Sequence, residues 1–250
     1  MHRLQGATAL ITGAGGGMGR AIARRLLDEG ARVVLADLSA SALDIATESL
    51  GADRERLATV VLDVTSDDSC AGAVSFALER FGELDILING AGIMARKDAL
   101  ATDTALFQAI LDVNLTGSYR MARAAYEGLT RSENPSIVSV SSTHAFLAAK
   151  NSIAYSTSKA GISHLTRLLA LEWATVGIRV NAVAPTVVPT NMTTDVLADP
   201  SYVARKMAAI PLGRPIPAED VAAAIAYLCS SDAASTTGQI LVLDGGESLA

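Results

Sequence analysis

The chain has 250 residues, of which half are apolar and 18% are charged, and its formal net charge is −6. This length and composition fit one large or two small α/β domains around a buried sheet, and the negative charge without a basic cluster argues against nucleic acid or an anionic membrane as a partner. No apolar run approaches the ~20 residues that cross a bilayer, and no signal-peptide pattern precedes the first apolar run, so we expect a cytoplasmic protein.

The N-terminal segment has the pattern of a strand, a glycine-rich turn and a helix. An apolar run over residues 7–12 is followed at once by GAGGGMG, and the helical pattern that begins there places Ile22 and Leu26 on one face. Glycine lets such a turn bend tightly and brings backbone N–H groups up to a pyrophosphate, which the helix N-terminus attracts. We therefore predict half of a βαβ unit that binds a dinucleotide. The candidate cofactor residues of this turn are Gly13, Gly15, Gly17, Met18 and Gly19.

A second strand is predicted over residues 32–36, and it ends in Asp37, 18 residues beyond Gly19. A carboxylate at this position can accept hydrogen bonds from both hydroxyls of an adenosine ribose and would repel a 2′-phosphate. Leu38 follows, and the glycine turn contains neither Arg nor Lys that would neutralise a phosphate. The pattern therefore favours NAD over NADP. The alternative is that Asp37 only begins the turn into the next helix.

The same alternation continues along the chain. Asp63 and Val64 follow the third predicted strand, where they can meet an adenine edge. The fourth strand ends in Asn89-Gly90-Ala91-Gly92, a run of small residues that would let a flat ring approach, with a plain turn as the alternative. The predicted elements of this part are helices over about 39–50 and 67–81 and strands over about 57–62 and 85–88.

Two further helices are predicted over about 101–112 and 115–131, with Asn114 between them. Asparagine at such a position is common as a helix cap. Beside Lys159 its side chain would instead hold a water molecule for a proton relay. Both interpretations stay open from the sequence alone.

Residues 136–140 form an apolar strand that ends in two serines, and the helix after it carries Tyr155 and Lys159 one turn apart. A phenol titrates near ~10, and a nearby cation favours the phenolate, so we predict that Lys159 lowers the pKa of Tyr155. A phenolate beside the Ser142 hydroxyl can take the proton of an alcohol while the serine polarises the oxygen. The hydride that leaves needs an acceptor, which implies a nicotinamide. The alternative is an exposed helical pair without function.

The last third of the chain completes the pattern. The helix continues to about 176 and is apolar on more than one face, which favours packing on another subunit. The polar segment 186–211 follows a strand and is predicted to be a substrate lid. Cys70 and Cys229 fit core thiols, and the three histidines are too scattered for a metal site. We find no domain boundary, so residues 1–250 are expected to form one dinucleotide-binding and catalytic domain. The remaining predicted elements are a strand over 178–184 stopped by Pro185, a helix from 217 and a strand over 239–243.

Together these motifs resemble the short-chain dehydrogenase/reductase family in its form of about 250 residues. The resemblance covers essentially the whole chain and implies a doubly wound Rossmann fold with a seven-stranded, mostly parallel sheet, an NAD(P) cofactor and usually a tetramer. The matching motifs are Thr12-Gly13-x-x-x-Gly17-x-Gly19, Asn89-Gly90-Ala91-Gly92, Asn114, Ser142, Tyr155-x-x-x-Lys159, and Thr237-Gly238 through Asp244-Gly245-Gly246.

The resemblance also assigns roles. It makes Tyr155 the acid/base and gives Lys159 the tasks of lowering its pKa and holding the nicotinamide ribose. Ser142 orients the substrate oxygen, and Asn114 supports the proton relay. Two departures are visible, Gly90 where the family often has Asn and Thr186 where Gly is usual. The cofactor contacts carried over or added at strand ends are Asp37, Asp63, Val64, Asn89, Ala91, Gly92, Pro185, Val188 and Thr190.

The substrate prediction rests on the loops near this centre. Thr186 after Pro185, together with Asn151, is similar to the branch that acts on sugars and polyols, such as xylulose reductases. His144 stands where hydroxybutyrate dehydrogenases bind a substrate carboxylate, although solvated loop residues are the alternative for both His144 and Asn151. We favour a secondary alcohol or ketone of a polyol, sugar or sugar acid. A 3-oxoacyl thioester or hydroxy acid is the alternative substrate, and a non-catalytic dinucleotide-binding protein is the alternative class.

Overall fold

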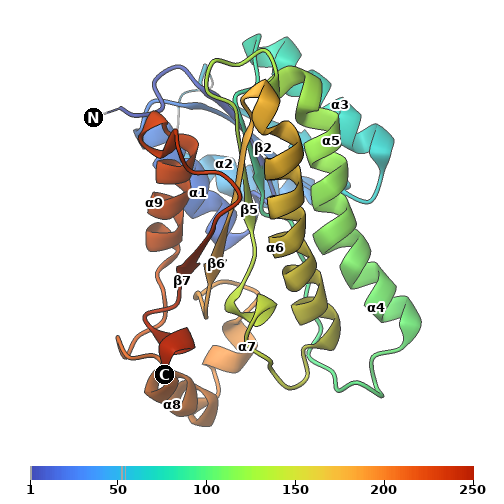
Figure 1. The fold of residues 1–250 in the computed structure, drawn as a ribbon, viewed down its shortest axis with the longest axis vertical. Helices are drawn as coiled ribbons and strands as arrows, with labels where there is room; N and C mark the ends of the chain where they lie inside the picture. The colour runs from blue at the N-terminus through green and yellow to red at the C-terminus, as the bar shows by residue number, and fades with distance from the viewer. Residues whose placement is uncertain (1, 52, 54) are drawn as a thin grey trace.

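The computed structural model describes residues 2–51, 53 and 55–250, and within them it contains a seven-stranded parallel sheet (Figure 1). The strand order is β3-β2-β1-β4-β5-β6-β7. From β1 the chain adds β2 and β3 on one side of the sheet, and it then crosses over and adds β4 to β7 on the other side, so the order reverses between β1 and β4. This arrangement confirms the predicted doubly wound sheet. The strands are β1 (Thr8–Thr12), β2 (Arg32–Asp37), β3 (Leu57–Val61), β4 (Ile86–Asn89), β5 (Ser136–Val140), β6 (Arg179–Pro185) and β7 (Ile240–Leu243).

Four of the described helices, α2, α3, α4 and α8, begin where a short polar side chain caps a free backbone N–H group. Ser66 accepts a hydrogen bond from the amide of Ser69 at 3.2 Å, and Asp103 accepts one from the amide of Leu106 at 2.8 Å. The helices are α1 (Gly17–Asp28), α2 (Ala40–Leu50), α3 (Asp67–Phe81), α4 (Thr104–Leu111), α5 (Gly117–Leu129), α6 (Ile153–Trp173), α7 (Thr194–Leu197), α8 (Pro200–Ala209) and α9 (Ala218–Cys229).

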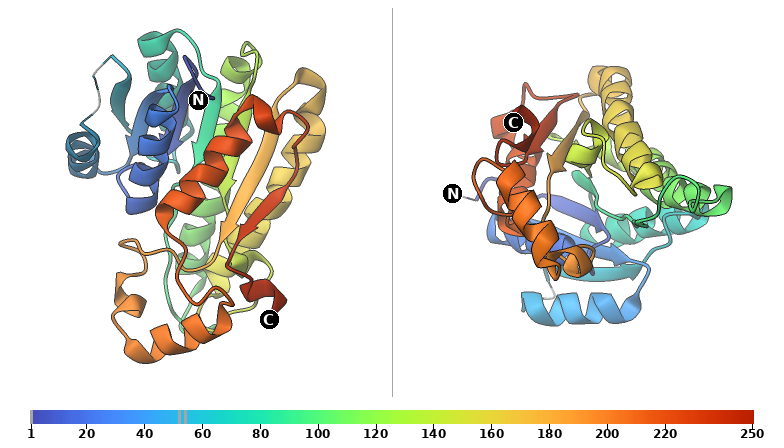
Figure 2. Two further views of the ribbon diagram at one scale, coloured as in Figure 1. Left: turned by 90° about the vertical axis from the view of Figure 1, so that its left-hand side faces the viewer. Right: turned by 90° about the horizontal axis from the view of Figure 1, so that it is seen from below.

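Both faces of the sheet are covered by helices (Figure 2). Leu10 and Ile137 belong to a buried cluster that includes residues of α3, α5 and α6. Their neighbours Ile11 and Val138 belong to a second cluster with residues of α1, α2 and α9. Because successive strand residues point to opposite faces, both of them apolar, the strands read as continuous apolar runs in the sequence. The helices thus leave the carboxyl ends of the strands as the place for a ligand.

The predicted break between two helices near Asn114 is wrong. A π-helical turn over Asp112–Thr116 joins α4 directly to α5. The backbone carbonyl of Asn114 inside this turn accepts a hydrogen bond from the Ser118 hydroxyl at 2.7 Å. Asn114 is therefore part of a continuous helical path and caps neither helix. A smaller correction concerns Pro185, which is the last residue of β6 and pairs with Leu243.

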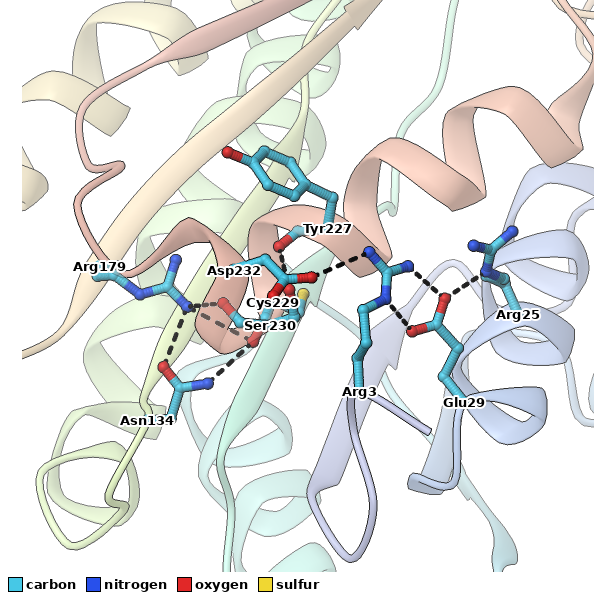
Figure 3. A network of polar contacts seen from close by, with 9 residues as sticks. All are labelled: Arg3, Arg25, Glu29, Asn134, Arg179, Tyr227, Cys229, Ser230 and Asp232. Atoms are coloured by element: carbon cyan, nitrogen blue, oxygen red, sulfur yellow. Dashed lines mark hydrogen bonds and ion pairs between the residues drawn. The ribbon is translucent and has the colours of Figure 1, made fainter. Parts of the chain in front are cut away.

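Polar contacts hold together the elements at the amino-terminal ends of the strands, opposite the end where a ligand is expected (Figure 3). Glu29 at the end of α1 accepts hydrogen bonds from Arg3 and Arg25, and Arg3 also lies 3.6 Å from Asp232. These charges tie the N-terminal segment to α1 and to the turn after α9. Although burial raises the pKa of Glu29, the two arginines bring its pKa below the usual value. The pair with Arg3 is partly buried, so solvent screens it less than it would a surface ion pair.

Arg179 at the start of β6 binds the end of α9 (Figure 3). Its guanidinium donates to the carbonyl of Leu228 at 2.6 Å and to that of Ala233 at 3.2 Å, and also to the side chain of Asn134 at 3.3 Å. The last carbonyls of a helix lack partners within the helix, and a cation is favourable there. Burial lowers the pKa of Arg179, yet its hydrogen bonds keep the charge satisfied inside the protein.

Candidate active site

A cavity of about 370 Å³ opens where the sheet winding reverses, at the carboxyl ends of β1, β2 and β4. Open α/β sheets bind their ligands at this position, and the volume is in the range of small-molecule and cofactor sites. The residues singled out by the sequence that line the cavity are Gly13, Gly17, Met18, Gly19, Asp37, Asp63, Val64, Ala91, Gly92, Tyr155, Lys159 and Thr190. Their cofactor contacts stay predictions.

The glycine turn packs closely against the tip of β4. Gly13 has φ of 69°, and a Cβ there would lie 2.8 Å from the backbone of Ala91. A Cβ on Gly19 would lie 2.5 Å from the carbonyl oxygen of Gly13. Both approaches are shorter than non-bonded atoms allow, so only glycine permits this turn. The first turn of α1 is thereby held at the cavity with its backbone N–H groups in place for an anion.

Asp37 closes β2 and lies at the cavity wall, where its carboxylate is already held by the backbone. It accepts hydrogen bonds from the amides of Gly15 and Ser39, both at 3.0 Å. The expectation that nothing nearby can neutralise a phosphate stays a prediction, although one cation does lie against the turn. Arg20, from the first turn of α1, donates to the carbonyl of Gly15 at 2.8 Å. The turn itself contains no cationic residue, but the side chain of Arg20 in the following helix reaches back to it.

Of the catalytic candidates, Tyr155 and Lys159 line the cavity, and Ser142 contacts Tyr155 from outside the lining. The side chains of Ser142 and Tyr155 share a hydrogen bond, and the Ser142 hydroxyl also donates to the carbonyl of Pro185 at 3.5 Å. The Lys159 ammonium lies 5.5 Å from the centre of the Tyr155 ring and donates to the carbonyl of Val140 at 2.7 Å. A hydroxyl and a phenol in contact can move a proton at the oxygen of a bound alcohol or ketone.

The electrostatics of this group differ from the prediction. The pKa of Tyr155 is raised, because burial outweighs the opposing effects of the Ser142 hydrogen bond and of the Arg96 charge. Burial also lowers the pKa of Lys159 to about 8. The predicted lowering of the Tyr155 pKa by Lys159 is thus wrong for the chain by itself, since removal from water disfavours both charged forms.

Asn114 is fully buried, and its side chain forms hydrogen bonds to two segments that are distant in the sequence. Its amide oxygen accepts from the backbone N–H of Ile93 at 2.8 Å, and its amide nitrogen donates to the carbonyl of Ile93 at 3.0 Å. The same nitrogen donates to the Ser158 hydroxyl at 2.9 Å, one residue before Lys159. Asn114 therefore joins the loop after β4 to α6. A Cβ on Gly92 would lie 3.3 Å from its amide oxygen and 3.7 Å from the Lys159 ammonium.

Other predicted site residues lie outside the cavity lining. Asn89 is buried between β4 and its surroundings, where its amide nitrogen donates to the Ser118 carbonyl and the Ser139 hydroxyl, both at 3.4 Å. Val188 is a buried core residue, and Gly15 contacts Asp37. The carbonyl of Pro185 accepts a hydrogen bond from the Ser142 hydroxyl. None of these four residues is part of the cavity lining, and their cofactor contacts stay predictions.

The two substrate candidates differ. His144 is enclosed beside Tyr155, with the two rings edge to face at 5.8 Å, and its Nδ1 lies 3.1 Å from the Ser152 hydroxyl. Burial lowers the pKa of His144, so the ring is neutral near pH 7. Asn151 is exposed and has φ of 57°, a backbone conformation that asparagine tolerates. The structure thus brings His144, but not Asn151, against the catalytic group.

Sequence reasoning missed several charged side chains around this group. Arg96, in the loop after β4, pairs with Asp195 on α7 at 2.9 Å. Lys206 on α8 pairs with Glu247, which also accepts a hydrogen bond from the Thr186 hydroxyl. Neither pair is signalled by local sequence spacing, because the partners are far apart in the chain. The apolar lining residues Ile93 and Met192 were also missed.

Within residues 2–51, 53 and 55–250 no group of three or more His, Cys, Asp or Glu side chains is placed to hold a metal ion. In the same residues no helix combines the length and the apolar character needed to cross a membrane.

Comparison with known proteins agrees with this geometry. The family model described as "Enoyl-(Acyl carrier protein) reductase" matches residues 13–248. Galactitol 2-dehydrogenase (L-tagatose-forming) of Cereibacter sphaeroides is 38% identical over 98% of this chain and 96% of its own. Cis-4-hydroxycyclohexanecarboxylate dehydrogenase of Sinomonas cyclohexanicum is 40% identical over 95% of each chain.

A solved structure shows a similar arrangement. The 3-ketoacyl-(acyl-carrier-protein) reductase from Brucella melitensis, crystallised with NADH, superposes with a TM-score of 0.90 at 33% sequence identity. The superposition covers 98% of this chain and 99% of that one. The resemblance therefore extends over the whole sheet and both helical layers.

Proposed function

Since the chain belongs to the short-chain dehydrogenase/reductase family, we propose that it transfers a hydride between NAD and a secondary alcohol or ketone of a polyol, sugar or sugar acid. That it is an oxidoreductase acting on CH–OH groups follows from its relatives. The observation that carries the proposal is the contact of Ser142 with Tyr155, a phenol that lines the cavity and has Lys159 beside it.

The residues of the cavity fit a dinucleotide. The glycines carry no side chains that would fill the turn, although the Gly15 amide already donates to Asp37, and the missing side chain of Gly92 keeps open the space next to Asn114 and Lys159. In this proposal the turn holds the pyrophosphate, Asp37 the adenosine ribose, and Tyr155 with Lys159 the nicotinamide ribose. The carboxylate of Asp37 supports NAD over NADP, while Arg20 would limit that preference.

When bound, the nicotinamide supplies or accepts the hydride. The protein moves the proton. In alcohol oxidation the ionised Tyr155 takes the proton from the substrate oxygen, and in ketone reduction the neutral phenol returns it. Ser142 donates to that oxygen as its charge develops, which favours the transition state over the ground state. Lys159, held by Val140 and steadied through Ser158 and Asn114, provides the positive charge beside the phenol.

A 3-oxoacyl thioester remains the second candidate substrate. It is favoured by the matching family description and by the NADH-bound 3-ketoacyl-(acyl-carrier-protein) reductase. The galactitol relative supports the first candidate. Turnover of a 3-oxoacyl thioester that exceeds turnover of every polyol would decide for the second.

The test is steady-state kinetics of the purified protein with NAD and NADP on a panel of polyols, sugars, sugar acids and 3-oxoacyl thioesters. Tyr155→Phe is expected to lower kcat at least ~10³-fold while NADH binding, followed by fluorescence, persists. Tyr227→Phe, on the surface end of α9, is the matched control and should behave as wild type. Wild-type turnover by Tyr155→Phe would show that the assigned chemistry is wrong.

We also propose a homotetramer in the cytoplasm. Apolar side chains stay exposed on α6, with Leu171 78% exposed, and Leu241 and Val242 are partly exposed on the edge strand β7. Such surfaces support burial against further copies. Cys70 and Cys229 are free thiols, which suits a reducing compartment. Light scattering of the purified protein measures the assembly, and a monomer at micromolar concentration would contradict it.

The domain organisation belongs to the same proposal. We take residues 1–250 as one dinucleotide-binding and catalytic unit, with residues 186–211 as its lid. The lid contains α7 and α8, which lie below the carboxyl ends of the strands in Figure 1. The pair of Arg96 with Asp195 and that of Lys206 with Glu247 attach it to the rest of the chain.

A further inference from the structure

A polar cluster lies next to the catalytic group and outside the cofactor cavity. It consists of Thr186 after β6, Lys206 on α8 and Glu247 in the C-terminal turn, which Figure 1 shows beside α8. Glu247 forms an ion pair with Lys206 and accepts a hydrogen bond from the Thr186 hydroxyl. The side chains of Lys206 and Glu247 are only 15% and 13% exposed, so water screens their charges weakly.

This cluster adjoins the place where the substrate oxygen must lie. Thr186 directly follows Pro185, whose carbonyl accepts a hydrogen bond from Ser142. On the same side the ring of His144 contacts that of Tyr155 edge to face. The charges of Lys206 and Glu247 both act on His144. The part of a substrate that extends beyond its reacting carbon would therefore meet Glu247 and Lys206.

The charges of this region are balanced. Lys206 is paired with Glu247, and Arg96, whose charge also reaches His144, is paired with Asp195. A substrate carboxylate would find both cations already neutralised and would be repelled by Glu247. An uncharged hydroxyl would find an acceptor, since a carboxylate has about four lone-pair sites and Glu247 uses two contacts for Lys206 and Thr186.

We propose that Glu247 makes the enzyme selective for uncharged polyhydroxylated substrates, because it neutralises Lys206 beside the substrate site and accepts hydrogen bonds from substrate hydroxyls. The inference rests on the proposed function and narrows its substrate class, since sugar acids and other hydroxy acids become the disfavoured members. Thr186, the departure from the family pattern, has a specific part in it: its hydroxyl fixes one oxygen of Glu247.

The test compares a polyol with the acid of the same carbon skeleton, galactitol and galactonate, in wild type and in Glu247→Gln. The amide keeps the size of the side chain and its acceptor oxygen, but it frees the Lys206 charge. We expect the ratio of kcat/KM for galactonate to that for galactitol to rise at least about tenfold, because one repelling unit charge is removed from a partly buried site beside the substrate. The inhibition constant of galactonate against galactitol should fall by a similar factor.

Two further variants show whether Glu247 acts through its charge or only by holding the lid in place. Lys206→Met leaves the Glu247 charge unpaired, so it should lower the ratio of kcat/KM for galactonate to that for galactitol. The double variant of Lys206→Met and Glu247→Gln has neither charge and should return this ratio close to the wild-type value. Glu83→Gln removes an exposed carboxylate that pairs with Arg32 away from the site, and it should leave the ratio unchanged.

The outcomes are distinct. If Glu247→Gln slows both substrates equally, or leaves the ratio unchanged while the polyol still turns over, Glu247 only holds the lid and the inference is wrong. A double variant that keeps the raised ratio would also refute it. Wild-type protein that turns over neither compound, nor any other alcohol of the panel, would overturn the proposed function and this inference with it.

Discussion

The buried ammonium of Lys159 should make the wild-type protein less stable than a variant that lacks it. Lys159 is 5% exposed, and burial lowers its pKa from 10.5 to about 8. We predict that Lys159→Met abolishes turnover but stabilises the fold at neutral pH. The sign follows from linkage: the folded pKa lies below the unfolded one, so the cost of the buried charge is complete below pH 8 and disappears as pH rises through about 10.5.

A pKa lowered to about 8 from 10.5 corresponds to about 3 kcal/mol of unfolding free energy at pH 7. Against this, the variant loses the hydrogen bond to the Val140 carbonyl, at about 1 kcal/mol. The net expectation is about 2 kcal/mol of added stability for Lys159→Met at pH 7. Between pH 7 and pH 10 the advantage should shrink by more than 2 kcal/mol, or ~0.8 kcal/mol per pH unit.

The assay is urea unfolding at fixed protein concentration without cofactor, followed by circular dichroism from pH 7 to pH 10. Lys150→Met is the matched control, because that side chain is exposed and its replacement should change neither the stability nor its pH dependence. A Lys159→Met protein that is no more stable than wild type at pH 7, or whose advantage is the same at pH 10, would refute the reasoning.

Three further outcomes are expected. Ser142→Ala should shift the pH dependence of alcohol oxidation upward, because the hydrogen bond from Ser142 lowers the pKa of Tyr155; an unshifted profile of kcat/KM against pH would contradict this. Asp37→Ser should raise kcat/KM with NADP at least ~10-fold by removing a repelling charge, and adding Arg20→Gln should cancel the gain if Arg20 supplies the compensating cation. Arg179→Met should lower the unfolding free energy by about 3 kcal/mol, since it leaves buried carbonyls at the end of α9 unpaired, and urea denaturation with an unchanged midpoint would exclude that role.

The sequence was sufficient for the seven strands and the helices that cover the sheet, because a parallel sheet buried on both faces leaves continuous apolar runs between helical periods. It did not predict α7 and α8, which lie in the polar segment 186–211. It located Tyr155, Lys159 and Ser142, since their spacing within one strand and one helix is local. The direction of the Tyr155 pKa shift could not be predicted from the sequence, because the burial of the phenol depends on how distant segments pack around it.

Contacts between distant segments explain the other misses. The π-helical turn at Asn114 depends on hydrogen bonds to Ile93 and Ser158, residues 21 and 44 positions away in the chain. The pair of Lys206 with Glu247 joins residues 41 positions apart, with no periodic pattern between them. Local propensity carries no information on such partners, so these parts of the site became visible only in the folded chain.

The widened turn at Asp112–Thr116 constrains how this protein can tolerate insertions and deletions. Removing one residue there would restore ordinary α-helical geometry at little local cost. However, the deletion would move Asn114, whose side chain hydrogen-bonds Ile93 and Ser158 from within this turn, and would break the link between the loop after β4 and α6. Length changes in natural or engineered variants should therefore accumulate in the surface loops, while this short stretch keeps a fixed number of residues.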